Sequence, residues 1–218
     1  MKKFKYVFLI IFIISLIYQG ICMISLELTL STIQKLILIV IQTLAIIGWT
    51  YFKIYNQKPQ VQYQYIRYAH IMIFLIYIFD LIYVLLFDPS LSRSSQAFVD
   101  YNHVNLEIMK TIRIFINGYQ SGVIHLDDIF INIFGNICIF MPMAYFLPYF
   151  LKSQRKWYLF FFTIAIMVLG IELLQVYLQT GFGDIDDWLL NVSGAMFLYG
   201  IFKCMKIEKV YKMIGRSK

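Results

Sequence analysis

Polar side chains recur at helical spacing inside three apolar segments in the last third of the chain. These segments cover about residues 127–150, 157–179 and 183–200. Polar groups at such positions are costly unless they are paired, so they usually either serve a function or join helices. The candidates are Asn132, Asn136, Glu172, Gln175, Asp184, Asp186, Asp187 and Asn191. Asn132 and Asn136, Glu172 and Gln175, and Asp187 and Asn191 are each separated by three or four residues, which places each pair on one face of a helix.

The depth of these residues predicts a shared pocket. Asn136, Glu172 and Asn191, together with Asp80 in an earlier apolar run, each lie roughly 8–10 Å from the outer end of their helix at 1.5 Å per residue. A common level on four helices favours one outward-facing polar pocket. Other roles remain open. One is a transporter or channel, against which the polar residues stop in the outer leaflet and define no path inward. The residues could only hold the bundle together, since interhelical amide bonds contribute about 0.6–2 kcal/mol. Alternatively, Glu172 could act as a general acid or base on a lipid-linked substrate.

The acidic run from Asp184 to Asp187 is best explained as a helix start. Carboxylates at an N-cap and in a first turn accept the unpaired backbone N–H groups and favour the helix dipole. No histidine lies nearby in the sequence, so we predict no metal site. There is no HExxH, phosphate-binding loop or nucleophile-elbow motif, and no cofactor is predicted. Whether the protein is an enzyme therefore stays open.

Composition sets the class of protein. Of the 218 residues 61% are hydrophobic and 14% are charged, and the mean hydropathy is +0.72. Soluble domains are about 45–50% apolar and about 25% charged, so the chain is predicted to be an integral membrane protein. The fold class is all-α, a polytopic transmembrane bundle. Three further apolar runs, at about residues 6–26, 33–52 and 68–87, bring the expected number of helices to about six.

The distribution of basic residues predicts the orientation. With the N-terminus inside, the outer side holds only four of the 19 Lys and Arg residues, namely Lys35, Arg93, Lys110 and Arg113. This bias predicts that both termini are cytoplasmic. Most of the basic residues that give the net charge of +7 then face the anionic lipids of the cytoplasmic leaflet. No nucleic-acid partner is expected.

The longest loop, about residues 88–126, is predicted to lie outside the cell. Within it, Ile108, Ile112, Phe115 and Ile116 fall on one helical face. This segment is too short to span a bilayer, but it can lie on the outer surface and cap the polar residues beneath it.

Three motifs in this order carry a family resemblance. They are Asn132 to Asn136 with Pro142 and Pro148; Glu172 to Gln175; and Asp184 to Asp187 with Asn191 and Gly194. With the stretch from Asn105 to Ile112, they resemble the VanZ-like family of teicoplanin-resistance-associated membrane proteins. The chain departs from that family in having Gly181-Phe182-Gly183 where an arginine is common. Ile108 and Met109 replace a Pro-Phe pair.

The resemblance implies a domain division, a location and a role. Residues 1–66 would form a two-helix accessory region, residues 67–203 the VanZ-like membrane domain and residues 204–218 a basic cytoplasmic tail. The protein would be a multi-pass component of the bacterial plasma membrane, in contact with membrane lipids. Its pocket would engage a lipid-linked cell-wall precursor or a lipoglycopeptide and so contribute to teicoplanin tolerance. The alternative is the membrane-embedded enzyme with Glu172 as acid or base.

Overall fold

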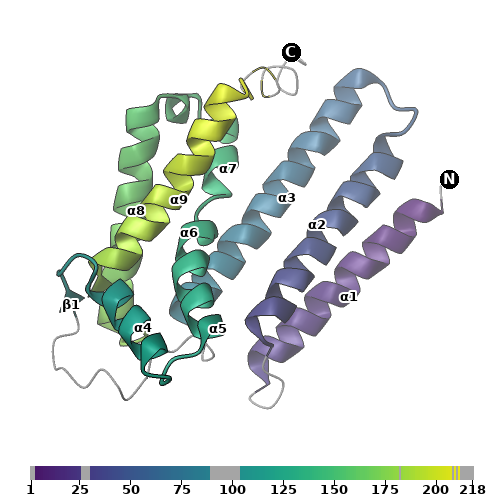
Figure 1. Cartoon of the computed structure of the whole chain (residues 1–218). Coiled ribbons are helices and arrows are strands. Elements are labelled where there is room, and N and C mark those ends of the chain that lie inside the picture. Colours follow the sequence, from purple (N-terminus) through teal and green to yellow (C-terminus); the bar gives the residue numbers. More distant parts are fainter. Residues whose placement is uncertain are drawn as a thin grey trace. The chain divides into compact units, whose positions relative to one another are not determined.

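The computed structural model describes residues 3–25, 30–88, 104–181, 183–207, 209 and 211. Much of the predicted outer loop (residues 89–103) and most of the predicted basic tail lie outside these residues. The described chain is almost entirely helical, as predicted, and it divides into two compact units (Figure 1). The first unit comprises residues up to Ile82, and the second comprises Tyr83–Tyr211. This division lies within the third helix, and the domain boundaries predicted from the sequence remain a prediction.

The first unit is built from long apolar helices. They are α1 (Phe4–Ile24), α2 (Thr32–Ile54) and the greater part of α3 (Pro59–Leu86). A capping box starts α2, because Ser31 and Gln34 each accept a hydrogen bond from the other's backbone N–H. Proline suits the first turn of a helix, where its missing N–H costs nothing, so α3 begins at Pro59, earlier than the apolar run suggests.

The second unit contains shorter elements. In chain order they are β1 (Val104–Asn105), α4 (Lys110–Gln120), α5 (Leu126–Ile129), the π-helical segment η2 (Phe130–Phe134), α6 (Gly135–Ile139), α7 (Met143–Phe150), the 3₁₀ turn η3 (Lys152–Arg155), α8 (Trp157–Leu178), β2 (Gly183–Asp184) and α9 (Ile185–Cys204). The strands β1 and β2 pair in parallel, with Val104 opposite Gly183 and Asn105 opposite Asp184. This pairing joins the start of the 104–120 segment to the start of α9.

The apolar run at 126–150 is not one regular helix. A π-helical turn interrupts it at Phe130–Phe134, and it breaks between Ile139 and Met143, where Pro142 is the N-cap of α7. Proline cannot donate a backbone hydrogen bond, so a break beside Pro142 is expected. The π-helical turn has no comparable signal in the sequence.

Five helical stretches in the described chain are long and apolar enough to cross a membrane. They are Phe4–Ile24, Ile33–Ile54, Pro59–Leu86, Leu126–Phe150 and Trp157–Leu178. The helix α9 has 20 residues but is not among them, and its first turn carries Asp186 and Asp187. These helices indicate a multi-pass membrane protein, whose exposed apolar side chains suit contact with lipid. That α9 also crosses the membrane remains a prediction.

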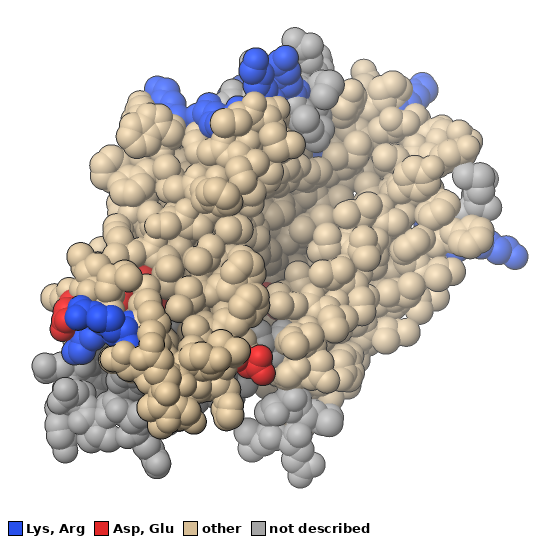
Figure 2. All heavy atoms as spheres, viewed as in Figure 1, with Lys and Arg blue, Asp and Glu red and all other residues tan. Residues whose placement is uncertain are grey.

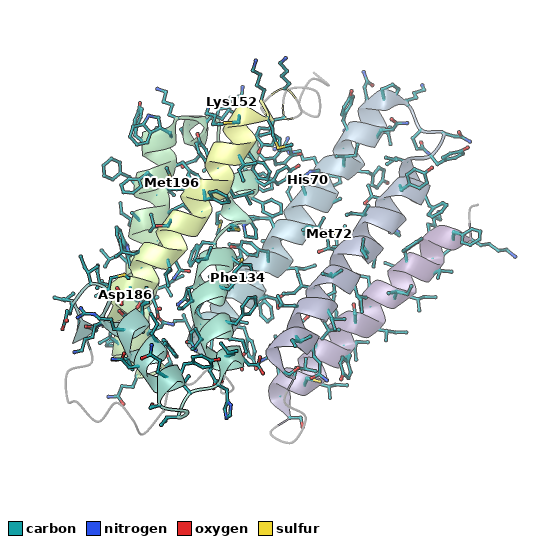
Figure 3. The ribbon with its side chains drawn as sticks, viewed as in Figure 1. His70, Met72, Phe134, Lys152, Asp186 and Met196 are labelled. Atoms are coloured by element: carbon teal, nitrogen blue, oxygen red, sulfur yellow. The ribbon has the colours of Figure 1, made fainter. Side chains whose placement is uncertain are left out.

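Charged side chains are unevenly distributed along the second unit. In Figure 2, Lys and Arg side chains gather at the end that carries η3 and the last turn of α9, whereas acidic side chains lie at the opposite end, where a smaller basic patch accompanies them. Figure 3 labels Lys152 and Asp186 at these two ends. The distribution suits the orientation expected from the sequence, in which Lys152 faces the cytoplasm.

Two exposed serines can test this orientation. Ser121 follows α4 and Ser153 lies in η3. In a variant whose Cys22, Cys138 and Cys204 are replaced by alanine, we expect a membrane-impermeant thiol reagent to label Ser121→Cys in intact cells. Ser153→Cys should react only after the membrane is opened. Labelling of Ser153→Cys alone in intact cells would reverse the assigned topology.

Candidate functional site

The N-terminus of α9 is the centre of a buried polar cluster in the second unit. We define the acidic cluster by its six buried side chains, Asn136, Glu172, Asp184, Asp186, Asp187 and Asn191. Asp184 is the N-cap of α9, and one of its carboxylate oxygens accepts a hydrogen bond from the backbone N–H of Asp186 at 2.9 Å. The N-cap role expected for the acidic run is therefore observed at Asp184.

Asp184 and Asp186 bind the segment that precedes α4. The Asp186 carboxylate accepts the backbone N–H of Met109 at 2.6 Å with one oxygen and that of Thr111 at 3.0 Å with the other. The Asp184 carboxylate accepts the Asn105 side-chain amide at 3.1 Å and the Thr111 hydroxyl. Asp186 thus caps the start of α4, since it occupies backbone N–H groups that a helix start leaves unpaired. Asp184 holds side chains of the same segment, which lies more than 70 residues away in sequence.

Asp187 links α9 to α6. Its carboxylate accepts a hydrogen bond from the Asn136 side chain at 2.5 Å. Asn191, one turn further along α9, donates to the Asp187 backbone carbonyl at 2.7 Å. The two helices come close because Gly194 follows on the same face, and a Cβ placed there would overlap the backbone carbonyl of Ile137. Small residues at a contact allow this close approach of helices.

Glu172 connects α8 to the same helix start. Its side chain is buried, and one carboxylate oxygen accepts the backbone N–H of Asp184 at 3.1 Å. Glu172 and Asn136 are thereby joined to the first residues of α9 from two different helices. The convergence of the Asn136, Glu172 and Asn191 side chains in one pocket, and the ligand-binding role assigned to them, stay predictions.

Three of the residues singled out from the sequence have other partners. Asn132 is half-buried and donates to the Asp128 carbonyl of its own helical segment at 2.8 Å. Gln175 donates to the Leu85 carbonyl in the last turn of α3 at 2.8 Å. Asp80 belongs to the first unit, where its carboxylate accepts a hydrogen bond from Gln19 at 2.5 Å. Its expected approach to the other polar residues stays a prediction.

Sequence reasoning missed two participants, Asn105 and Thr111. The segment around them was interpreted by its apolar periodicity as a surface helix, whereas α4 begins at Lys110 and β1 occupies Val104–Asn105. The signal lay in residue type, because Asn and Thr are frequent partners of backbone and carboxylate groups beside helix starts. Nothing local to them indicates that the carboxylates come from Asp184 and Asp186.

The cluster has the chemistry of a hydrogen-bond acceptor site. The amide oxygen of Asn191 is buried and has no hydrogen-bond partner in the described part of the chain. A buried acceptor without a donor costs about 1–3 kcal/mol, so a ligand hydroxyl, a ligand N–H or a water molecule would be favoured there. Among the described residues, no three His, Cys, Asp or Glu side chains are grouped so that they could hold a metal ion.

Comparison with known proteins identifies one family. Residues 71–206 match the model of the VanZ/LLP1 family. This range contains every element of the second unit from β1 to α9 and the acidic cluster, whereas α1 and α2 precede it. No curated protein and no solved structure matches the chain.

Proposed function

The chain belongs to the VanZ/LLP1 family of membrane proteins, and from this premise we propose that its acidic cluster binds a cell-envelope ligand at the outer face of the bacterial plasma membrane. The ligand class is a lipid-linked cell-wall precursor or a lipoglycopeptide. Binding of this kind would let the protein contribute to teicoplanin tolerance.

One observation carries the proposal, the buried amide oxygen of Asn191, which has no hydrogen-bond partner among the residues that the structure describes. It lies one helical turn from Asp187, whose carboxylate already accepts a hydrogen bond from Asn136. Sugars and peptides present many hydroxyl and amide N–H donors, and a buried acceptor discriminates strongly between ligands that supply a donor and ligands that do not. The unpaired amide oxygen of Asn191 therefore supports a ligand rich in hydrogen-bond donors.

The segment that Asp186 holds in place supports the same role. Both oxygens of Asp186 accept backbone N–H groups, so this residue is engaged in holding the segment around Met109. That segment and α4 then act as a cover for the cluster, and the amphipathic character of α4 suits a position at the membrane surface. In this arrangement the ligand-facing groups are Asn136, Glu172 and Asn191.

The test compares two asparagines with the same local bond. Asn191 and Asn132 each donate to the carbonyl four residues earlier, but only Asn191 belongs to the acidic cluster. In a teicoplanin-susceptible bacterium that expresses the protein, we expect Asn191→Leu to abolish the gain in tolerance and Asn132→Leu to preserve it. The carbonyl released by Asn191→Leu keeps its helical hydrogen bond, so the fold should persist.

Affinity measurements with the purified protein test ligand binding directly, independently of the tolerance of the cells. Loss of one donor–acceptor bond should weaken binding of teicoplanin, or of a lipid-linked precursor in detergent, by roughly tenfold, since 1.4 kcal/mol corresponds to a factor of ten. Equal affinity of Asn191→Leu and the unchanged protein for both ligands, at equal membrane abundance, would refute the proposal.

The second candidate function is a membrane-embedded enzyme that acts on a lipid-linked substrate. It is favoured by the buried carboxyl of Glu172, which lies beside the start of α9. In Glu172→Gln the new amide oxygen can still accept the Asp184 N–H, so the bundle should remain folded. A general acid or base contributes about 10²–10⁴-fold, and its loss should remove turnover of the precursor by isolated membranes.

A matched control is Glu107→Gln, which alters an exposed pair with Arg113 worth no more than about 1 kcal/mol. If product forms at the same rate with Glu172→Gln as with Glu107→Gln, acid–base catalysis by Glu172 is excluded and its role is to join α8 to α9.

A further inference from the structure

A second buried polar cluster lies in the first unit and joins three helices. Gln42 of α2 donates a hydrogen bond to the Gln19 amide oxygen at 2.6 Å, and Gln19 of α1 donates to the Asp80 carboxyl group of α3 at 2.5 Å. The three side chains are at most 7% exposed. Each of the three helices is long and apolar enough to span a membrane, so these polar groups must find their partners within the protein.

This chain of hydrogen bonds lacks one donor. Gln19 uses its amide oxygen for Gln42 and its amide nitrogen for Asp80. The second carboxyl oxygen of Asp80 and the amide oxygen of Gln42 are both buried, and neither has a hydrogen-bond partner in the described part of the chain. Both groups are one hydrogen bond away from the same Gln19 amide. Two acceptors cannot bond to each other, but one added hydrogen between them would pair both.

A negative charge on Asp80 would be poorly compensated. Asp80 lies six residues before the end of α3, roughly 9 Å along the helix. An ionised carboxylate at such a depth needs a cation or several donors to replace its hydration. Among the described residues its hydrogen bond comes from the uncharged amide of Gln19, and no Lys, Arg or His is paired with it. The site therefore favours the neutral form of the carboxyl group.

We propose that Asp80 binds a proton on the oxygen that Gln19 does not contact, and that the resulting O–H donates to the Gln42 amide oxygen. The proton turns one unpaired acceptor into a donor for the other and removes the charge from the hydrocarbon. The chain then closes into a ring of three hydrogen bonds, to which each of the three helices contributes one donor.

This proton has a structural role. Gln19 and Gln42 lie on helices that precede the family match at residues 71–206, whereas Asp80 lies within it. The ring is thus the polar contact by which α3 holds the preceding pair of helices. In a bilayer, helices associate through packing and interhelical hydrogen bonds, and a polar network rigidifies a core only when its members are all satisfied. The proposal is independent of the acidic cluster.

A buried water molecule is the alternative donor. It could give one hydrogen to each unpaired oxygen, but it would leave the carboxylate charge in hydrocarbon. The cavity of about 340 Å³ beside Gln19 has neither Asp80 nor Gln42 in its wall, so water in that cavity would lie beside Gln19 rather than beside the two unpaired oxygens. The two alternatives differ in the charge of Asp80, which can be measured.

Infrared spectroscopy of the full-length protein in lipid nanodiscs tests for the proton directly. A protonated carboxyl group absorbs as a carbonyl, apart from the bands of an ionised carboxylate. At neutral pH, the difference spectrum between the unchanged protein and Asp80→Asn should contain a carbonyl band with the intensity of one carboxylic acid per chain. Asp127→Asn, which alters an exposed acid of α5, is the control and should change only carboxylate bands. Carboxylate bands alone in the Asp80→Asn difference would show that Asp80 is charged and would overturn the proposal.

Gln42→Leu gives a second test in which Asp80 is unaltered, so the result does not depend on the folding of Asp80→Asn. Loss of the Gln42 acceptor should shift the carbonyl band of the protonated Asp80 to higher frequency. An unchanged spectrum in the carbonyl region of carboxylic acids would contradict the proposed O–H bond.

Melting temperatures in the same nanodiscs test the ring. An asparagine at position 80 keeps an acceptor for Gln19 and supplies an N–H donor for Gln42, so Asp80→Asn should melt within a few degrees of the unchanged protein. Asp80→Leu supplies neither group and should melt clearly lower, since it leaves the Gln19 donor unpaired as well. Equal melting temperatures of the two variants would mean that Asp80 does not hold the helices through hydrogen bonds, and would exclude the ring.

Discussion

Gly194→Ala is expected to destabilise the second unit by about 3 kcal/mol, the upper end of typical overpacking costs. A Cβ at this position would overlap the backbone carbonyl group of Ile137, and backbone atoms cannot rotate away as a flexible side chain can. The helices α6 and α9 must then move apart. Their separation would also lengthen the hydrogen bond between Asn136 and Asp187 and so disturb the acidic cluster.

Gly200→Ala is the matched control for this prediction. Gly200 lies on the same helix, six residues later, and a Cβ there would meet nothing within 4 Å. Alanine is favoured over glycine inside a helix by about 0.5–1 kcal/mol, so Gly200→Ala should be neutral or slightly stabilising. Melting temperatures of both purified variants in detergent give the comparison. Equal melting temperatures would mean that α6 and α9 are not in close contact at Gly194.

The helical architecture could be predicted because it follows from long apolar runs. Residues 4–24 and 157–178 each form one helix whose extent is close to that expected from hydropathy. The N-cap at Asp184 follows equally from local chemistry, since a carboxylate before an apolar helix accepts an unpaired N–H. The spacing of Asp187, Asn191 and Gly194 placed them on one face, and that face is the one that contacts α6.

The connections between distant segments could not be predicted from local pattern. Asp186 accepts hydrogen bonds from a segment 75 or more residues earlier, and no periodicity encodes that pairing. Asn132 and Asn136 have the spacing of a shared face, but the π-helical turn at Phe130–Phe134 intervenes, and only Asn136 is buried. The sequence did not single out Gln19 or Gln42; the hydrogen bonds from Gln19 to Asp80 and from Gln42 to Gln19 require the tertiary structure.

Asp186→Ala is expected to release the start of α4. The side chain is only 1% exposed, and its two oxygens accept the backbone N–H groups of Met109 and Thr111. A hydrogen bond to a charged group contributes about 1.5–3 kcal/mol, but Met109 is exposed and water can replace part of the loss. Met109 also holds a left-handed backbone conformation (φ 65°), which a residue with a side chain adopts only when its surroundings stabilise it. The expected destabilisation is about 2–3 kcal/mol.

Hydrogen exchange distinguishes this release from general unfolding. In Asp186→Ala, amide exchange at Met109 and Thr111 should accelerate by at least tenfold, while the middle of α8 keeps its protection. Asp186→Asn should give a smaller effect, because one carboxamide oxygen still accepts a backbone N–H and the amide group cannot accept the other. Asp127→Asn, an exposed acid in α5, is the control and should leave both rates unchanged. Unaltered exchange at Met109 and Thr111 in Asp186→Ala would mean that β1 and α4 hold their position without Asp186. That result would contradict the capping role of the Asp186 carboxylate.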